Sequence, residues 1–322
     1  MSTSASHGTQ LTPHPPVTSR ADVRRRTVPL PLLEAGMVLA WSSGFIGMRL
    51  TVDHAPMVLV VFWRCALVAL LLMPWVAGAL RRARPAALLT QAGIGALAMT
   101  GYLAGVGKGI ELGVPAGLAA LMADLLPIGT AVLAMLFLGQ RPSRRVWAGL
   151  LIGLLGVVLV TRDALSLGNA SLWSYGLPLL GMLSLAVATL WAKRLPLADA
   201  LGLLPTLWVQ CTVSALVFGV WTASEGSLAP LPTVGFGISV IWTAFSTLGG
   251  YGLYWLCLRR ASPTRVASLL YLSPGVTLIW GALMFGEPLS GTMALGMLVS
   301  GWGVLMMVRA ERQPGALHRP SP

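Results

Sequence analysis

Two oppositely charged residues, Asp124 and Arg64, lie inside long apolar stretches of this sequence. An ionisable group at the centre of a membrane helix costs about 2.5–3.5 kcal/mol on insertion scales, so such residues are rare and usually functional. Asp124 stands three residues before Pro127, whose missing N–H leaves a backbone carbonyl of the preceding turn unpaired. An acid beside such backbone suits binding of a proton, a cation or an ammonium group. A structural Asp that bonds a neighbouring helix is the competing interpretation.

Arg64 is the second charge at depth, about a third of the way into its apolar stretch. Its guanidinium has the chemistry to pair with Asp124 or to hold the carboxylate of a solute. Its long stem also lets the charge reach the membrane surface, and a structural role is therefore the favoured interpretation.

Aromatic residues give a further signal. Tyr251 lies near the middle of its apolar stretch, and Tyr102 occupies the matching place in an earlier stretch. Tyr and Trp offer a flat apolar wall with one polar handle, which suits an organic solute or an ammonium group. Many membrane Tyr and Trp residues instead anchor at the interface, and we expect that role for Trp255.

Small and hydroxylated residues near mid-depth complete the candidate set, although helix packing alone would also explain them. The predicted solute-binding residues are Trp41, Ser43, Arg64, Tyr102, Asp124, Thr189, Trp191, Trp242, Tyr251, Tyr271 and Ser273. The predicted helix breaks are at Pro127 and Pro274.

Other kinds of site are not indicated. All four histidines lie in tails or a loop, so we expect no histidine metal site within the membrane. No phosphate-binding loop is present, and we expect no cofactor. The cysteines Cys65, Cys211 and Cys257 lie in apolar stretches at unrelated spacings, which predicts neither a disulfide framework nor a metal site.

Composition sets the environment of these residues. The 322 residues are 56% hydrophobic and only 10% charged, whereas a soluble domain carries about 25% charged residues. The lipid bilayer must therefore be the solvent. The net charge of +12 comes from short basic clusters between apolar stretches, a distribution that argues against a nucleic-acid partner.

A spanning helix needs about 20 mainly apolar residues. Unpaired backbone cannot face hydrocarbon, so each such stretch should be a helix. Ten spans are predicted, at 30–50, 56–79, 86–107, 114–138, 146–161, 174–192, 200–221, 233–256, 264–285 and 291–308. We expect 1–29 to form a disordered cytoplasmic arm and 310–322 a cytoplasmic tail.

The basic residues predict the orientation, because Lys and Arg in short loops stay cytoplasmic. With the N-terminus inside, all but four of the 22 Lys and Arg residues fall on the inner side. The exceptions are Lys108 and Arg162 in outer loops, and Arg49 and Arg64 within spans. Both termini are therefore predicted to be cytoplasmic.

The sequence also repeats itself. A shift of 147 residues lays 120–162 over 267–309 without a gap. The matched pairs include Pro127 with Pro274, Gly139 with Gly286, and Gly156 with Gly303; Asp124 falls on Tyr271. Each half, 30–162 and 174–309, then holds five spans. Five is odd, so the second half must enter the membrane upside-down.

Inverted repeats are typical of secondary transporters, whose substrate site lies near the midplane between the halves. Glycines at 149, 153 and 156, with 296 and 303, fit close helix contacts or a dimer interface. Whether the protein is a monomer or a homodimer stays open.

The chain resembles the EamA family of the drug/metabolite transporter (DMT) superfamily. The resemblance rests on WSSGFIGMR in the first span, on GVPAGLAALMADLLPIGTAVLAMLFLGQ, and on the second copy ASPTRVASLLYLSPGVTLIWGALMFGE. It covers about 30–309 and implies an all-α polytopic membrane protein with ten helices in two inverted five-helix repeats. It also implies a central cavity and export of metabolites or drugs.

The leading hypothesis is a secondary transporter that exports a small organic metabolite, such as an amino acid or related amine, by alternating access. A proton gradient or the solute's own gradient would drive it across a bacterial inner membrane. A carrier of cationic drugs is the main alternative. A membrane-embedded enzyme acting on lipids, which needs clustered acids or histidines, and a passive channel are less favoured.

Overall fold

The computed structural model describes residues 28–52, 54–112, 114, 119, 122–162, 171–195, 201–286 and 290–311. Residues 1–27 of the predicted N-terminal arm, 312–322 of the tail, and 115–118 and 120–121 of the predicted span 114–138 lie outside these residues.

The first half of the chain forms five helical segments. They are α1 (Leu30–Val52), α2 (Met57–Arg82), the continuous run of α3 (Pro85–Gly95), η1 (Ala96–Gly101) and α4 (Tyr102–Glu111), then α6 (Leu126–Leu138) and α7 (Arg144–Thr161).

The second half repeats this order. It contains η3 (Leu172–Tyr175) leading into α8 (Gly176–Arg194), α9 (Leu203–Glu225), α10 (Val234–Arg260), the run of α11 (Pro263–Leu269), η5 (Leu270–Leu272) and α12 (Ser273–Phe285), and finally α13 (Gly291–Glu311).

These helices match the predicted spans. In the part of the chain that is described, eight segments are long and apolar enough to cross a membrane, and α6 is a shorter apolar helix. With α7, these make ten helical segments in the described residues, so the predicted all-α fold is confirmed. Large apolar side chains such as Leu70, Trp75, Phe245 and Leu283 leave most of their surface exposed, as lipid-facing residues do.

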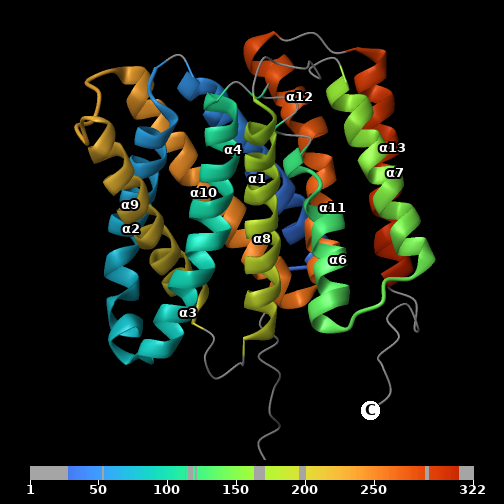
Figure 1. The fold of residues 1–322 in the computed structure, drawn as a ribbon, viewed down its shortest axis with the longest axis horizontal. Helices are drawn as coiled ribbons and strands as arrows, with labels where there is room; N and C mark the ends of the chain where they lie inside the picture. Colours follow the sequence, from blue (N-terminus) through green and yellow to red (C-terminus); the bar gives the residue numbers. More distant parts are fainter. Residues whose placement is uncertain are drawn as a thin grey trace, which may run out of the picture.

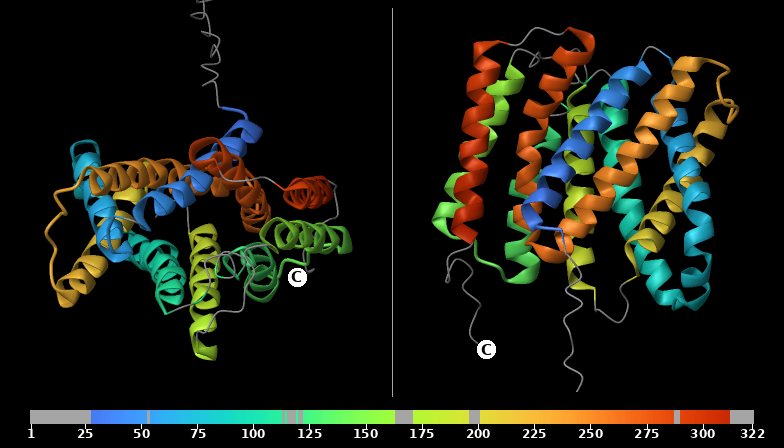
Figure 2. Two further views of the ribbon diagram at one scale, coloured as in Figure 1. Left: turned by 90° about the horizontal axis from the view of Figure 1, so that it is seen from above. Right: turned by 180° about the vertical axis from the view of Figure 1, so that it is seen from behind.

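The two halves have opposite orientations (Figure 1). The turn between α6 and α7 lies at the bottom of the bundle, whereas α12 ends and α13 begins at the top, and the rear view in Figure 2 agrees. Both α6 and α12 carry Pro in the first turn and end at a left-handed glycine, Gly139 with φ 63° and Gly286 with φ 67°. Equivalent local structures thus sit on opposite sides of the protein.

Corresponding helices from the two halves pack together. The helices α2 and α9 lie side by side, as do α7 and α13, while α1 packs along α10. Glycines allow the close approach of α7 and α13: a Cβ atom at Gly149 would lie 2.8 Å from the Gly303 carbonyl oxygen. The predicted small-residue contacts are therefore made within one chain.

Candidate functional site

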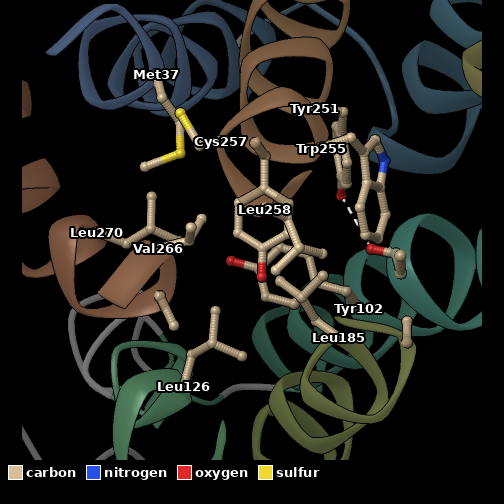
Figure 3. Close-up of a cluster of buried hydrophobic side chains, with 14 of the residues drawn as sticks. Met37, Tyr102, Leu126, Leu185, Tyr251, Trp255, Cys257, Leu258, Val266 and Leu270 are labelled. Atoms are coloured by element: carbon tan, nitrogen blue, oxygen red, sulfur yellow. Dashed lines mark hydrogen bonds between the residues drawn. The ribbon is translucent and has the colours of Figure 1, made fainter. Parts of the chain in front are cut away.

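Four aromatic side chains gather inside the bundle. Trp41 of α1 lies with its ring centroid 5.2 Å from Tyr251, 5.5 Å from Tyr254 and 6.2 Å from Tyr102. We call Trp41, Tyr102, Tyr251 and Tyr254 the aromatic group. Figure 3 shows Tyr102 from α4 and Tyr251 from α10 in one buried cluster, beside Trp255. The aromatic group therefore contains residues from both halves of the protein.

A π-helical turn positions Tyr102. The segment η1 ends at Gly101, directly before Tyr102, and single π-turns inside helices often mark functional sites. Such a turn breaks the regular ladder, and the Tyr251 hydroxyl donates a hydrogen bond of 3.1 Å to the Ala98 carbonyl oxygen within it. The Ser184 hydroxyl of α8 donates to the Leu97 carbonyl at 2.8 Å. Three spans are thus joined at this turn.

Asp124 lies at the helix break. The helix α6 begins at Leu126 with Pro127 in its first turn, so Asp124 sits in the turn just before it. The side chain is half-buried and makes no hydrogen bond or ion pair with any residue that the structure describes. It is close enough to Tyr102 and Tyr271 to interact with both electrostatically.

Tyr271 is the repeat counterpart of Asp124, and the two lie near one another across the halves. Tyr271 is buried in η5, immediately before α12, and its hydroxyl has no hydrogen-bond partner among the described residues. Next to it, the Ser273 and Ser42 hydroxyls are 2.9 Å apart and join α12 to α1. The two helix breaks therefore bring polar groups to the same region.

Arg64 supplies the opposite charge. It is buried on α2, with 5% of its surface exposed, and its Nε has no hydrogen-bond partner in the described part of the chain. It interacts electrostatically with Tyr251. Arg64 and Asp124 form no ion pair with each other among the described residues. Each charge interacts with a different residue of the aromatic group: Arg64 with Tyr251, and Asp124 with Tyr102.

Thr189 of α8 and Tyr254 of α10 form a buried polar pair. Their oxygens are 2.7 Å apart, and both side chains are fully buried. Trp255 is also buried and donates from Nε1 to the Gln210 Oε1 at 2.9 Å. The expectation that Trp255 anchors at the interface is therefore wrong, because Gln210 of α9 supplies a partner for its N–H inside the bundle.

Three predicted residues lie elsewhere. Trp242 donates from Nε1 to the Ser43 carbonyl at 2.8 Å, and both line a mainly apolar groove of about 430 Å³ between α1 and α10. Trp191 is 40% exposed and packs against Gly93, so it lies on the outer surface of the bundle. The structure does not bring Trp191 to the aromatic group.

Sequence reasoning missed a buried ion pair. Arg265 donates from Nε and Nη2 to the two carboxylate oxygens of Glu34, at 2.7 and 2.9 Å. Ser262 caps α11 and Pro263 opens it, which places Arg265 in the first turn of a helix. That Ser-Pro helix start was the available signal.

Comparison with known proteins identifies the family of this chain. The model of the EamA-like transporter family matches residues 31–162 and again residues 172–309. The inner membrane transporter YedA of Escherichia coli K12, itself uncharacterized, is 27% identical over 84% of this chain and 89% of its own. A probable amino-acid metabolite efflux pump of Salmonella typhimurium is 27% identical over 81% of this chain and 88% of its own.

A protein of known crystal structure shares the fold. It has a TM-score of 0.73 and 17% identity, and the match covers 88% of this chain and 99% of that one.

Proposed function

This chain belongs to the EamA-like transporter family, a family of non-enzymatic membrane carriers, and from that membership we propose that it exports an amino acid or a related amine. The family and the fold establish a multi-pass membrane transporter. The class of solute and the direction of transport are the proposal, and the charges around the aromatic group support it.

The observation that carries the proposal is the placement of two unpaired charges. Asp124 interacts with Tyr102 and Arg64 interacts with Tyr251, both members of the aromatic group. Neither charge has an ion-pair partner among the described residues. Uncompensated charges are costly inside a membrane. A solute that carries both an ammonium and a carboxylate would compensate both charges, whereas a simple cation would compensate only Asp124.

The aromatic group would hold the body of the solute. Trp and Tyr faces attract an ammonium group through the ring quadrupole and pack against apolar side chains. Trp41 touches the other three members, so a solute beside it would contact both halves of the protein at once. Contact with both halves is what a carrier needs to couple binding to their relative motion.

Alternating access requires that one side be closed while the other is open. At the end of the bundle where α10 ends, basic side chains bind backbone carbonyls: Lys193 donates to Leu258 and Ala261 at 2.8 and 2.9 Å, and Arg259 to Leu201 at 2.8 Å. With the Glu34–Arg265 pair, these contacts support a conformation closed on this side.

We assign this closed side to the cytoplasm. The basic clusters of the loops gather there, and the positive-inside rule places such loops in the cytoplasm. The named relatives include an inner membrane transporter and an efflux pump, which supports a bacterial inner membrane and outward transport. Both chain termini are then cytoplasmic.

Asp124 would also provide coupling. A carboxylate that binds either a proton or the ammonium of the solute exchanges one for the other. Such exchange would let an inward proton gradient drive export. The solute's own gradient would suffice if Asp124 stayed ionised throughout the cycle.

Counterflow in proteoliposomes tests the proposal. Vesicles loaded with one unlabelled amino acid should accumulate the labelled form with saturable kinetics, and empty liposomes provide the control. A panel of amino acids, their amines and quaternary cations separates the two main candidates. Saturable exchange of quaternary cations without any amino acid would favour drug efflux, and exchange of none of these solutes would reject both.

A further inference from the structure

Two cysteines from opposite halves of the protein converge on one methionine. Cys65 lies on α2, Cys211 on α9 and Met99 in η1, and all three are fully buried. The Sγ atoms of Cys65 and Cys211 each lie 3.9 Å from the Met99 Sδ. The two thiols also interact directly with one another. Three sulfur atoms from three helical segments therefore form one cluster.

The symmetry of the fold explains this meeting. Cys211 follows Cys65 by 146 residues, close to the offset of 147 that relates the two repeats. The two thiols thus hold nearly equivalent positions in the two halves, and α2 packs against α9 where they meet. This spacing along the chain does not resemble any metal-binding motif, so the sequence by itself predicts no metal site here.

We propose that Cys65, Cys211 and Met99 form a binding site for a soft monovalent metal ion, Cu(I) or Ag(I). Thiolate and thioether sulfurs are the ligands that select Cu(I). Metal–sulfur bonds of about 2.3 Å in a trigonal plane place the sulfurs ~4.0 Å apart. The two separations between a thiol sulfur and the Met99 sulfur, each 3.9 Å, match this spacing.

Charge selects a monovalent ion. The Arg64 guanidinium interacts with both thiols, and its Nε has no hydrogen-bond partner among the described residues. Binding of the metal releases both thiol protons, so two thiolates, one guanidinium and one monovalent ion sum to zero charge. A divalent ion would leave a net positive charge in a buried site, which is unfavourable.

The bound ion would tie the two halves together. Cys65 and Met99 belong to the first half and Cys211 to the second, so the metal would bridge them beside the aromatic group. Such a bridge stabilises the folded protein, since a ligand that binds only the native state raises its stability. This consequence does not depend on which solute the protein transports.

Titration of the purified, reduced protein with Cu(I) against a competing chelator tests the site. We expect one Cu(I) per chain for the wild type, with a thiolate-to-metal absorption band and a raised Tm. Cys65→Ser and Cys211→Ser should each abolish this stoichiometric binding. Met99→Leu should weaken it by at least about tenfold, one decade on the affinity scale. Cys257→Ser is the matched control and should bind as the wild type does.

X-ray absorption of the Cu(I)-loaded wild type gives a readout that does not depend on the folding of any variant. Sulfur neighbours alone, at about 2.3 Å, are expected. Nitrogen or oxygen ligands, no binding by the wild type, or unchanged binding after Cys65→Ser and Cys211→Ser would overturn the proposal. Zn(II) binding as tight as that of Cu(I) would overturn the charge argument.

Discussion

Arg265 of α11 donates two hydrogen bonds, of 2.7 and 2.9 Å, to the carboxylate of Glu34 of α1, and both side chains are buried. The pair joins the first helix of one half to the other half. Glu311 of α13 lies close by, and the Ser262 hydroxyl donates one hydrogen bond that its two carboxylate oxygens share, at 2.7 and 2.9 Å. Charged groups from three helices thus meet at one end of the protein.

Glu34→Gln should destabilise the purified protein. The change leaves Arg265 buried without a counter-charge, and breaking a buried ion pair in this way costs about 3–5 kcal/mol. Thermal unfolding in detergent measures the loss. The control is Glu225→Gln, which alters an exposed carboxylate bonded to Trp221 and should change stability far less. Equal Tm shifts for the two variants would show that the pair does not stabilise the folded protein.

Asp124→Asn should abolish transport driven by a pH gradient while leaving the protein folded. The amide cannot exchange a proton for an ammonium group. Loss of a charge-assisted hydrogen bond should also weaken binding of the solute by about 1.5–3 kcal/mol. Uptake into proteoliposomes with and without an imposed pH gradient checks this, and circular dichroism confirms folding. Retention of the full response to pH by the variant would reject Asp124 as the coupling site.

Thr189→Val should lower the free energy of unfolding by about 1–3 kcal/mol, because it leaves the buried Tyr254 hydroxyl without its partner. Adding Tyr254→Phe should recover most of the loss, since both polar groups are then gone. Thr130→Val is the matched control, because the buried Thr130 hydroxyl has no partner among the described residues and its removal should be neutral or stabilising. No recovery in the double variant would mean that the pair is not an isolated unit.

Gly303→Ala should force α7 and α13 apart. The new Cβ would lie 2.6 Å from the Gly149 carbonyl oxygen, and overpacking of this kind typically costs about 1–3 kcal/mol. Gly237→Ala, at the fourth residue of α10 where a Cβ meets nothing within 4 Å, should instead keep or slightly raise the stability. Chemical denaturation of both variants gives the comparison. Equal stability of the two variants would contradict the tight contact.

The length of each apolar stretch and the distribution of charge in the loops were enough to predict the helices and the inverted halves. An apolar stretch of about 20 residues needs lipid around it, and the structure has helices at these places. Sequence reasoning also placed Asp124 and Tyr271 at equivalent positions of the two repeats, and the fold brings them close enough to interact electrostatically.

The direction in which a side chain points from its helix could not be predicted from the sequence. Trp255 and Trp191 both lie near span ends on stretches that are apolar all round, yet one is buried against Gln210 and the other faces outward. The π-turn at η1 has no sequence marker, and the approach of Cys65 to Cys211 depends on how α2 crosses α9. These features arise from tertiary packing.

The central claim is that Arg64 holds the carboxylate of a zwitterionic solute, and paired solutes test it most directly. For the amino acid that shows counterflow, the affinity of its methyl ester, which lacks the carboxylate, should be compared with that of the parent in the wild type and in Arg64→Met. We predict that the wild type binds the ester at least about tenfold more weakly, a difference of ~1.4 kcal/mol, and that this gap disappears in Arg64→Met. A gap of the same size in both proteins would contradict the account.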